Sequence, residues 1–315
     1  MAGKISFLRS FVAEFGEIRI DGTNGADDTL RVEFVVERDK LFFPNCAELR
    51  VTNLSADTRA RLTAAGPVTA RISAGYDGDP SVIFFGVLDH CEHVKDGSSG
   101  DWTTRLSSSD GARHIKEAKV SKSFAKGTTV ATIVKELLKS LHLGEGNIKD
   151  FAFDSDMLRT LNAAASVFGN AAEELAYWLR SAGLEFSIQN GKIQFTKIGR
   201  GAPNTQGPLL TPDTGLVGSV TLSRERCTDL TRKGPKKRKT DDEIAAILSG
   251  KNDDDETTQV IEGTCLLNPA LVPGVPFRVG SATVTGDFLC CAIRHRGDSR
   301  GNDWFTEFRG IPLIQ

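Results

Sequence analysis

Two segments that lie far apart in the chain resemble one another, and this likeness constrains the fold more than any other feature. The apolar run 81–90 is followed by a polar turn and then by Asp101-Trp102-Thr103-Thr104. The run 288–295 is likewise followed by a polar turn and then by Asp303-Trp304-Phe305-Thr306. A strand, a turn and a second strand explain each copy. The sequence therefore predicts two similar β modules in one chain.

Segments upstream extend this repeat, because 51–54 has a counterpart in 265–269. The spacing from Asn53 to Trp102 is 49 residues (102 − 53), and that from Asn268 to Trp304 is 36 (304 − 268). A loop deletion accounts for the difference of 13, and so does a chance similarity. If the duplication is real, three chains present six similar faces around one axis, and such a trimer could dock onto a hexameric ring.

The segments between 17 and 120 are typical of strands, since short runs with period-two alternation are separated by turn clusters. Several short strands of this kind favour a sandwich or a barrel. Strand patterns return at 217–222 and again from 259 to the end. Between these β regions, the segment 199–215 holds four glycines and three prolines, which indicates a linker between domains.

The middle of the chain has a different pattern. An apolar stripe with helical spacing predicts a helix near 128–142, with Gly144 available to end it. Asn170 is a candidate N-cap for a second helix near 170–182. The dipeptide Asn190-Gly191 predicts the turn of a hairpin over 184–198, with Phe186 opposite Phe195. The stripe of the first helix consists of Val130, Ile133, Val134, Leu137, Leu138 and Leu141.

Composition excludes several classes of protein. The 39 Lys and Arg against 41 Asp and Glu give a net charge of −2, which argues against a globally basic nucleic-acid binder. No run approaches the roughly 18 apolar residues of a membrane-spanning helix, and the N-terminus shows no secretory signal. The six cysteines form no CxxC pair. We therefore expect free, mostly buried thiols in a protein made in a reducing cytoplasm.

With these segments in this order, the chain resembles the baseplate hub proteins of phage tails. It also resembles the related hub regions of phage-derived contractile injection systems, such as type VI secretion spikes. Each motif is weak alone, but the ordered set covers nearly the whole chain. The motifs lie at 44–55, 74–76 with 83–86, 170–195, 214–218, 265–269 with 273–274, and 295–306.

The resemblance implies an α+β, mainly β fold, with two tube-like antiparallel β-barrel domains and a small inserted α/β domain. We expect the first barrel in 1–124, the α/β domain in 125–206, and the second barrel in 207–315 with a charged insert at about 226–258. In that family three subunits form a ring, which adapts the six-fold tail tube to the three-fold central spike. The resemblance thus implies a structural virion protein rather than an enzyme.

Partners and location follow from the same resemblance. The implied partners are further copies of the chain in a homotrimer, the tail tube protein, the central spike protein, the tape-measure protein and baseplate wedge proteins. DNA would pass through a central channel whose lining we expect to be acidic or neutral, because basic walls would hold phosphates. The protein would be assembled in the cytoplasm of the bacterial host and would reside in the tail baseplate.

Two other functions stay open, a hexameric tube-end protein of similar fold and a cell-wall hydrolase of the tail tip. The residues predict no catalytic, cofactor or metal site, since GxSxG, HExxH and GxGxxG are all missing. The segment 89–93 has metal-ligating residue types, but neighbours on a strand face opposite ways. Of the candidates, a basic run is either a solvated loop or a docking loop for an acidic surface or DNA: Lys236, Lys237, Arg238 and Lys239.

Overall fold

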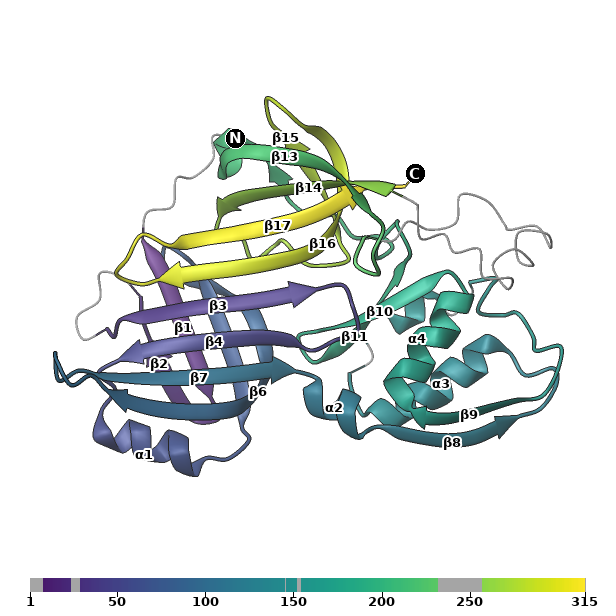
Figure 1. Ribbon diagram of the computed structural model, residues 1–315, viewed down its shortest axis with the longest axis horizontal. Coiled ribbons are helices and arrows are strands. Elements are labelled where there is room, and N and C mark those ends of the chain that lie inside the picture. The colour runs from purple at the N-terminus through teal and green to yellow at the C-terminus, as the bar shows by residue number, and fades with distance from the viewer. Residues whose placement is uncertain (1–7, 24–28, 145, 152–153, 232–256, 315) are drawn as a thin grey trace.

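The computed structural model describes residues 8–23, 29–144, 146–151, 154–231 and 257–314. Its fold is mainly β, with two antiparallel β modules and a small module of helices and two-stranded sheets beside them (Figure 1). The predicted fold class is confirmed. The predicted domain boundaries stay a proposal, and we use the names first β module, second β module and small module for the three parts.

The first β module holds seven strands in the order β3-β4-β7-β6-β5-β1-β2, and every neighbouring pair is antiparallel. Alternate residues of each strand point into one apolar core, which includes Phe11, Phe34 and Leu49. The elements are β1 (Arg9–Phe15), β2 (Ile18–Asp21), β3 (Val32–Asp39), β4 (Asn45–Thr52), α1 (Ala56–Ala64), β5 (Thr69–Tyr76), β6 (Asp79–Lys95) and β7 (Trp102–Asp110).

The second β module has the order β13-β14-β17-β16-β15, and β12 adds to β15 in parallel. It has its own core, which includes Phe277, Phe288 and Phe308. The elements are β12 (Leu209–Leu210), the 3₁₀ turn η2 (Pro212–Thr214), β13 (Leu216–Arg226), β14 (Thr257–Leu266), β15 (Pro276–Gly280), β16 (Thr285–Asp298) and β17 (Trp304–Pro312).

The predicted internal repeat is present, because the order β3-β4-β7-β6-β5 recurs as β13-β14-β17-β16-β15. The hairpin β6–β7 maps onto β16–β17 with a constant offset of 202 residues (295 − 93 and 304 − 102). His93 lies opposite Thr104 and His295 lies opposite Thr306. In both pairs the histidine Nδ1 hydrogen-bonds the threonine Oγ1, at 3.0 and 2.8 Å. The shared bonds exclude a chance similarity.

Both hairpins also carry a bulge at the same place. The register shifts between Leu88 and His90 in the first hairpin and between Cys290 and Ala292 in the second. A bulge bends a strand and strengthens its twist. The two modules are therefore bent alike.

Upstream of the hairpins, the structure shows that the two copies of the repeat align one residue differently from the alignment expected from the sequence. The amide of Asn53 donates to the carbonyl of Trp102, and the amide of Leu267 donates to the carbonyl of Trp304. Asn53 is thus equivalent to Leu267 and not to Asn268, whose likeness in the sequence was misleading.

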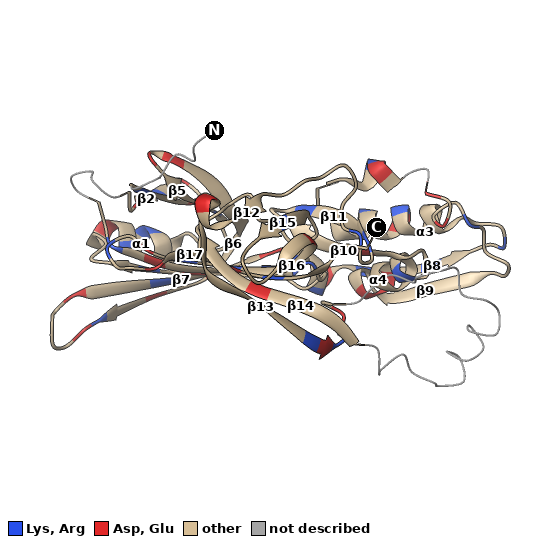
Figure 2. Ribbon diagram, turned by 90° about the horizontal axis from the view of Figure 1, so that it is seen from above, with Lys and Arg blue, Asp and Glu red and all other residues tan. Residues whose placement is uncertain are grey.

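The two β modules are joined into one continuous sheet, which the sequence pattern did not predict. The second half of β16 pairs with β3 in antiparallel register, from Ala292 opposite Asp39 to Asp298 opposite Glu33. The wall of the sheet therefore runs β13-β14-β17-β16-β3-β4-β7-β6. Figure 2 views this wall nearly edge-on, with β2, β5, β12 and β15 on one side of it.

The small module packs its two longer helices against one hairpin and a second two-stranded sheet, around one core. Strand β8 lies in this module and not in the first β module, because it pairs with β9. This pairing favours a boundary near Gly111 over the expected one at 124/125. The elements are α2 (Ala112–Glu117), β8 (Lys119–Phe124), α3 (Val130–Leu141), the 3₁₀ turn η1 (Ile148–Phe151), β9 (Ala165–Asn170), α4 (Ala171–Ser181), β10 (Leu184–Gln189) and β11 (Lys192–Lys197).

Short-range sequence signals correctly predicted the start of α4 and the turn between β10 and β11. Asn170 caps α4 by accepting from the amides of Ala172 and Glu173. The β10–β11 turn is formed by Asn190 and Gly191, both with positive φ. Helix α3, however, ends at His142 in the left-handed region rather than at Gly144.

The expected linker at 199–215 is packed against the second β module. The amide of Gly207 donates to the carbonyl of Pro276, and Leu209 lies opposite Arg278 in the β12–β15 pair. The glycines and prolines of this segment let the chain follow the edge of the sheet closely. The segment is therefore not an unattached linker.

None of the six cysteines, all of which lie in the described ranges, forms a disulfide, and three of them are buried. Cys265, Cys290 and Cys291 are buried, whereas Cys46 is exposed and the other two are half-buried. In the described part of the chain, no helix has the length and apolar character that crossing a membrane requires.

Candidate functional site: the charged face of the sheet

One face of the wall is covered by the cores of the β modules, and the opposite face is open. Residues on β17 alternate between the two faces, so that Phe308 is buried while Glu307 and Arg309 lie on the open side. We call this open side the charged face. Its charged members on the central strands are Glu262, Glu307, Arg309, Arg294, Arg296, Glu33, Glu37, Glu48, Arg50 and Arg105.

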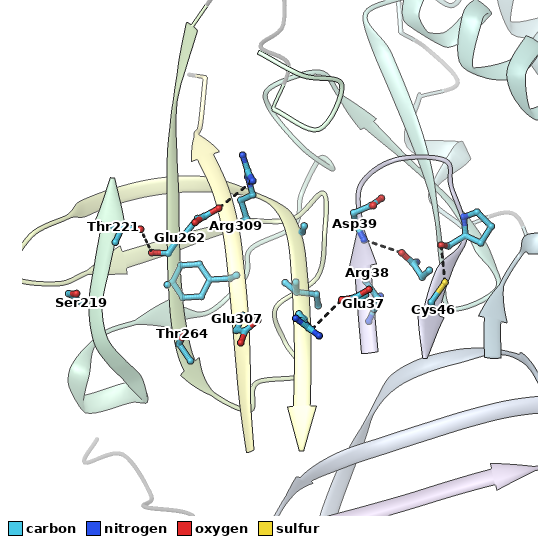
Figure 3. A pocket seen from close by; sticks show the side chains of 17 residues that line it. Glu37, Arg38, Asp39, Cys46, Ser219, Thr221, Glu262, Thr264, Glu307 and Arg309 are labelled. Atoms are coloured by element: carbon cyan, nitrogen blue, oxygen red, sulfur yellow. Dashed lines mark hydrogen bonds and ion pairs between the residues drawn. The ribbon is translucent and has the colours of Figure 1, made fainter. Parts of the chain in front are cut away.

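The charged face is hollowed where the two β modules meet. A hollow of about 690 Å³ extends from β13 across β14, β17, β16 and β3 to β4. Figure 3 shows Thr221, Glu262 and Arg309 on one side of it and Glu37, Asp39 and Cys46 on the other. The face is therefore concave across the junction.

The arginines of this face are matched with carboxylates on neighbouring strands. Arg294 Nε lies 3.2 Å from Glu37 Oε1, and this ion pair links the two modules across the junction. Arg309 lies 3.3 Å from Glu262 and also pairs with Glu225. Exposed ion pairs of this kind contribute only about 0–1 kcal/mol each to stability. Their main consequence is that the concave surface has little net charge.

Arginine pairing continues beyond the hollow. Arg296 bridges Asp303 at 3.2 Å and Glu307 at 3.5 Å, and Arg105 lies 3.6 Å from Glu92 at the far end of the wall. A guanidinium already paired with a carboxylate attracts a passing phosphate less strongly. The paired arginines of this face are therefore less available to an anion from solution.

The segment 89–93 contains side chains of types that bind metals, and they lie on opposite faces of the sheet, as the alternation along a strand predicts. Cys91 and His93 lie on the core side, with Sγ and Nε2 3.6 Å apart, and burial raises the pKa of the Cys91 thiol. Glu92 lies on the charged face. Within the described ranges, no three metal-ligating side chains come together.

The candidate docking residues lie outside the described residues: Lys236, Lys237, Arg238 and Lys239.

Two strand edges of the wall are open among the described residues, and the sequence did not reveal them. No described strand pairs with the outer edge of β13, or with residues 89–95 of β6 on the side away from β7. Leu222 on β13 is 52% exposed, whereas Val36, its equivalent on β3, is fully buried. An open edge with exposed apolar residues is a surface suited to pairing with another strand.

Comparison with known proteins finds the same fold in phage tails. A tail protein from Neisseria meningitidis aligns over 97% of both chains, with 14% identity and a TM-score of 0.59. The 43 kDa tail protein of prophage MuSo2 from Shewanella oneidensis aligns over 97% of this chain and 98% of that one, with 11% identity and a TM-score of 0.60. This chain has the fold of a phage tail protein.

A third similar structure comes from a secretion machine. The Escherichia coli protein c3393, a component of the type VI secretion system, aligns over 96% of this chain and 77% of its own length, with 13% identity and a TM-score of 0.56. That protein is described as similar to the T4 tail proteins gp27 and gp5. No protein-family model matches the chain, and no curated protein sequence does. The resemblance predicted from the sequence is confirmed at the level of the fold.

Proposed function

We propose that the protein is a homotrimeric baseplate hub, which adapts a six-fold tail tube to a three-fold central spike. The observation that carries the proposal is the duplicated four-strand unit, β13-β14-β17-β16 followed by β3-β4-β7-β6, laid side by side in one sheet. Each chain then supplies two similar units to a ring. Three chains supply six, which is the number that a six-fold partner requires.

The open edges of the wall are equivalent to the strands that join the two modules. Residues 292–298 of β16 pair with β3 inside the chain, and at the offset of 202 residues the equivalents of 292–297 are 90–95 in β6. The partner strand β3 is equivalent to β13, since Leu222 lies opposite Ile261 as Val36 lies opposite Ala47. Edge β6 of one copy can therefore pair with edge β13 of the next as β16 pairs with β3.

This equivalence defines the register of the contact between copies. The pair Arg294–Glu37 inside the chain translates into Glu92 of one copy opposite Ser223 of its neighbour. The antiparallel direction is preserved, because β6 runs parallel to β16 in the wall. Backbone hydrogen bonds along this edge would make one continuous ring of sheet.

In such a ring we place the charged face toward the central channel, with the tape-measure protein and then DNA passing along it. The matched arginine and carboxylate side chains support this placement, because a lining of low net charge does not retain phosphates. The tail tube, the central spike and baseplate wedge proteins are the partners proposed for the rest of the surface. The site of action is the virion tail baseplate, after assembly in the host cytoplasm.

The mass of the purified assembly tests the proposal. We expect a trimer of about 102 kDa (3 × 34.0) by light scattering or native mass spectrometry. A hexamer of about 204 kDa (6 × 34.0) would favour a tube-end protein instead. Clear turnover of peptidoglycan by the purified protein would favour a cell-wall hydrolase over a structural role.

Disulfide trapping tests the edge contact. In a background with Cys46, Cys91 and Cys227 replaced by serine, we expect Glu92→Cys together with Ser223→Cys to form disulfides between copies under mild oxidation. Directly opposed residues of an antiparallel pair have Cα atoms about 4.5–5.5 Å apart, which suits a disulfide. The product is a covalent dimer and trimer on non-reducing gels.

The matched control combines Glu92→Cys with Arg224→Cys. Arg224 is the next residue on β13, and its side chain points to the other side of the sheet. We expect little cross-linking of this variant. Equal cross-linking of both variants, or a trimer by mass without any in-register disulfide, would show that the copies associate through another surface.

A further inference from the structure

Strands β6 and β16 each leave a neighbouring strand at the same point. Strand β16 leaves β15 at Cys290, whose amide donates to the carbonyl of Val275, directly before β15 begins. Strand β6 leaves β5 at Leu88, whose amide donates to the carbonyl of Val68, directly before β5 begins. Beyond these points β16 pairs with β3, and the equivalent part of β6 is the open edge. The internal junction therefore predicts, residue by residue, the contact between copies.

Four opposed pairs of the internal junction place their side chains on the charged face, and one of the four joins opposite charges. That pair is Arg294 with Glu37, which form the ion pair across the junction. In the pair beside it, Ala292 lies opposite Asp39, and both residues line the hollow. There a methyl group faces a carboxylate. The remaining two pairs are Arg296–Val35 and Asp298–Glu33.

The same register between copies moves the oppositely charged pair by one position. Equivalent residues differ by 202 between β16 and β6 (295 − 93) and by 186 between β13 and β3 (222 − 36). The internal ion pair therefore corresponds to Glu92 opposite Ser223, which does not join opposite charges. The pair beside the hollow corresponds to His90 opposite Glu225 (292 − 202 and 39 + 186), so that an imidazole ring faces a carboxylate.

Both of these side chains lie on the charged face, as the contact requires. His90 is exposed on the open edge of β6, and Glu92, two residues further along the strand, is on the charged face. Side chains two residues apart on a strand share a face, so His90 is on the charged face as well. Glu225 pairs with Arg309 of its own chain and accepts from Ser223 Oγ at 2.9 Å, which holds its carboxylate on the same face of β13.

We propose that His90 of one copy binds Glu225 of the next copy, and that this pair replaces the internal ion pair in the contact between copies. This inference rests on the proposed trimer. Directly opposed side chains of an antiparallel pair have Cβ atoms about 4.5–5.5 Å apart, so the ring N–H of His90 can donate to the carboxylate. The carboxylate of Glu225 then links the imidazole of one copy to Arg309 of the other.

The sign of one substitution in two backgrounds tests this pair. Glu225→Gln keeps the shape of the side chain and removes its charge. In the natural chain we expect this substitution to weaken the trimer. In the background of His90→Glu we expect it to strengthen the trimer, because it removes the repulsion between two opposed carboxylates. A role of Glu225 within its own chain would give the same sign in both backgrounds.

The readout is the protein concentration at which half of the chains are trimeric, measured by sedimentation velocity over a dilution series. For a trimer that does not dissociate on dilution, the rate of subunit exchange between two isotopically labelled preparations is measured by native mass spectrometry. Unfolding in urea is followed in parallel for each variant. This separates a weaker contact between copies from a less stable chain.

We expect His90→Glu to raise the half-trimer concentration about tenfold or more, and added Glu225→Gln to recover most of that loss. The matched control is Ser107→Glu. Ser107 lies opposite His90 on β7, and its side chain is on the same face but one strand further from the open edge. We expect this control to leave the half-trimer concentration nearly unchanged.

Two outcomes would overturn the pair while leaving the proposed function intact. One is a trimer of unchanged affinity in His90→Glu, and the other is an effect of Glu225→Gln with the same sign in both backgrounds. A natural chain that forms no trimer would defeat the proposed function together with this inference.

Discussion

As the pH falls from 6.5 toward 3, His295 is expected to destabilise the folded protein by up to about 5 kcal/mol. Its ring is fully buried, and burial, together with the positive charge of Arg38, lowers the pKa of His295 from 6.5 to about 3. Between these values the unfolded chain binds a proton that the folded chain does not. The titration of His295 therefore leaves the stability unchanged above pH 6.5. It lowers the stability as the pH falls through this window, and the loss is complete below pH 3.

The measurement is the free energy of unfolding in urea as a function of pH, for the natural chain and for His295→Gln. Replacement by a group that does not titrate is expected to flatten the profile between pH 6.5 and 3 relative to the natural chain. His93→Gln is the matched control, because His93 makes the same bond to a threonine but is only half-buried. Parallel profiles for the natural chain and His295→Gln would contradict the assigned cause, and the profile of the natural chain is informative even if the variant folds poorly.

Replacing Glu185 by alanine is expected to cost about 3–5 kcal/mol of stability. The side chain of Lys40 has no exposed surface, and its Nζ lies 2.5 Å from Glu185 Oε1. Without the carboxylate, the ammonium group stays buried and uncompensated. Lys40 directly follows β3, and Glu185 lies on β10. The loss should therefore appear in urea unfolding and also loosen the small module from the wall.

Two controls separate the buried charge from simple loss of an ion pair. The double variant Lys40→Met with Glu185→Leu removes both charges and is expected to recover most of the lost stability, since apolar replacements of buried pairs are often neutral or better. Asp287→Ala breaks the exposed Arg278–Asp287 pair and should cost no more than about 1 kcal/mol. A double variant as unstable as Glu185→Ala would indicate that packing, and not charge, explains the loss.

The buried guanidinium of Arg38 shows how the small module is anchored at a place that no motif marks. Its Nε and Nη2 donate to Gln189 Oε1 at 3.1 and 2.8 Å, at the start of the β10–β11 turn. Burial lowers the pKa of Arg38 to about 10, so the group remains charged at neutral pH. The sequence predicted the turn correctly, but it held no signal for the side chain that receives it, because the two are 151 residues apart.

Elements governed by neighbours in the chain were predictable from the sequence. The cap at Asn170, the turn at Asn190 and Gly191, and the apolar stripe of α3 depend on residues within one or two turns of each other. The repeat was detectable too, since the hairpins kept their length and their tryptophans. The alignment upstream was off by one residue, because an asparagine in each copy outweighed the true hydrogen-bonding position.

Tertiary structure alone decided how the two modules are joined and what their open face carries. Pairing of β16 with β3 brings together residues 33–39 and 292–298, and strand pairing over such distances depends on backbone groups that every sequence possesses. The same pairing sets Arg294 against Glu37 and creates the concave, nearly neutral face. Short-range pattern reveals which way each residue of a strand points, whereas the choice of neighbouring strand comes from the packing of whole modules.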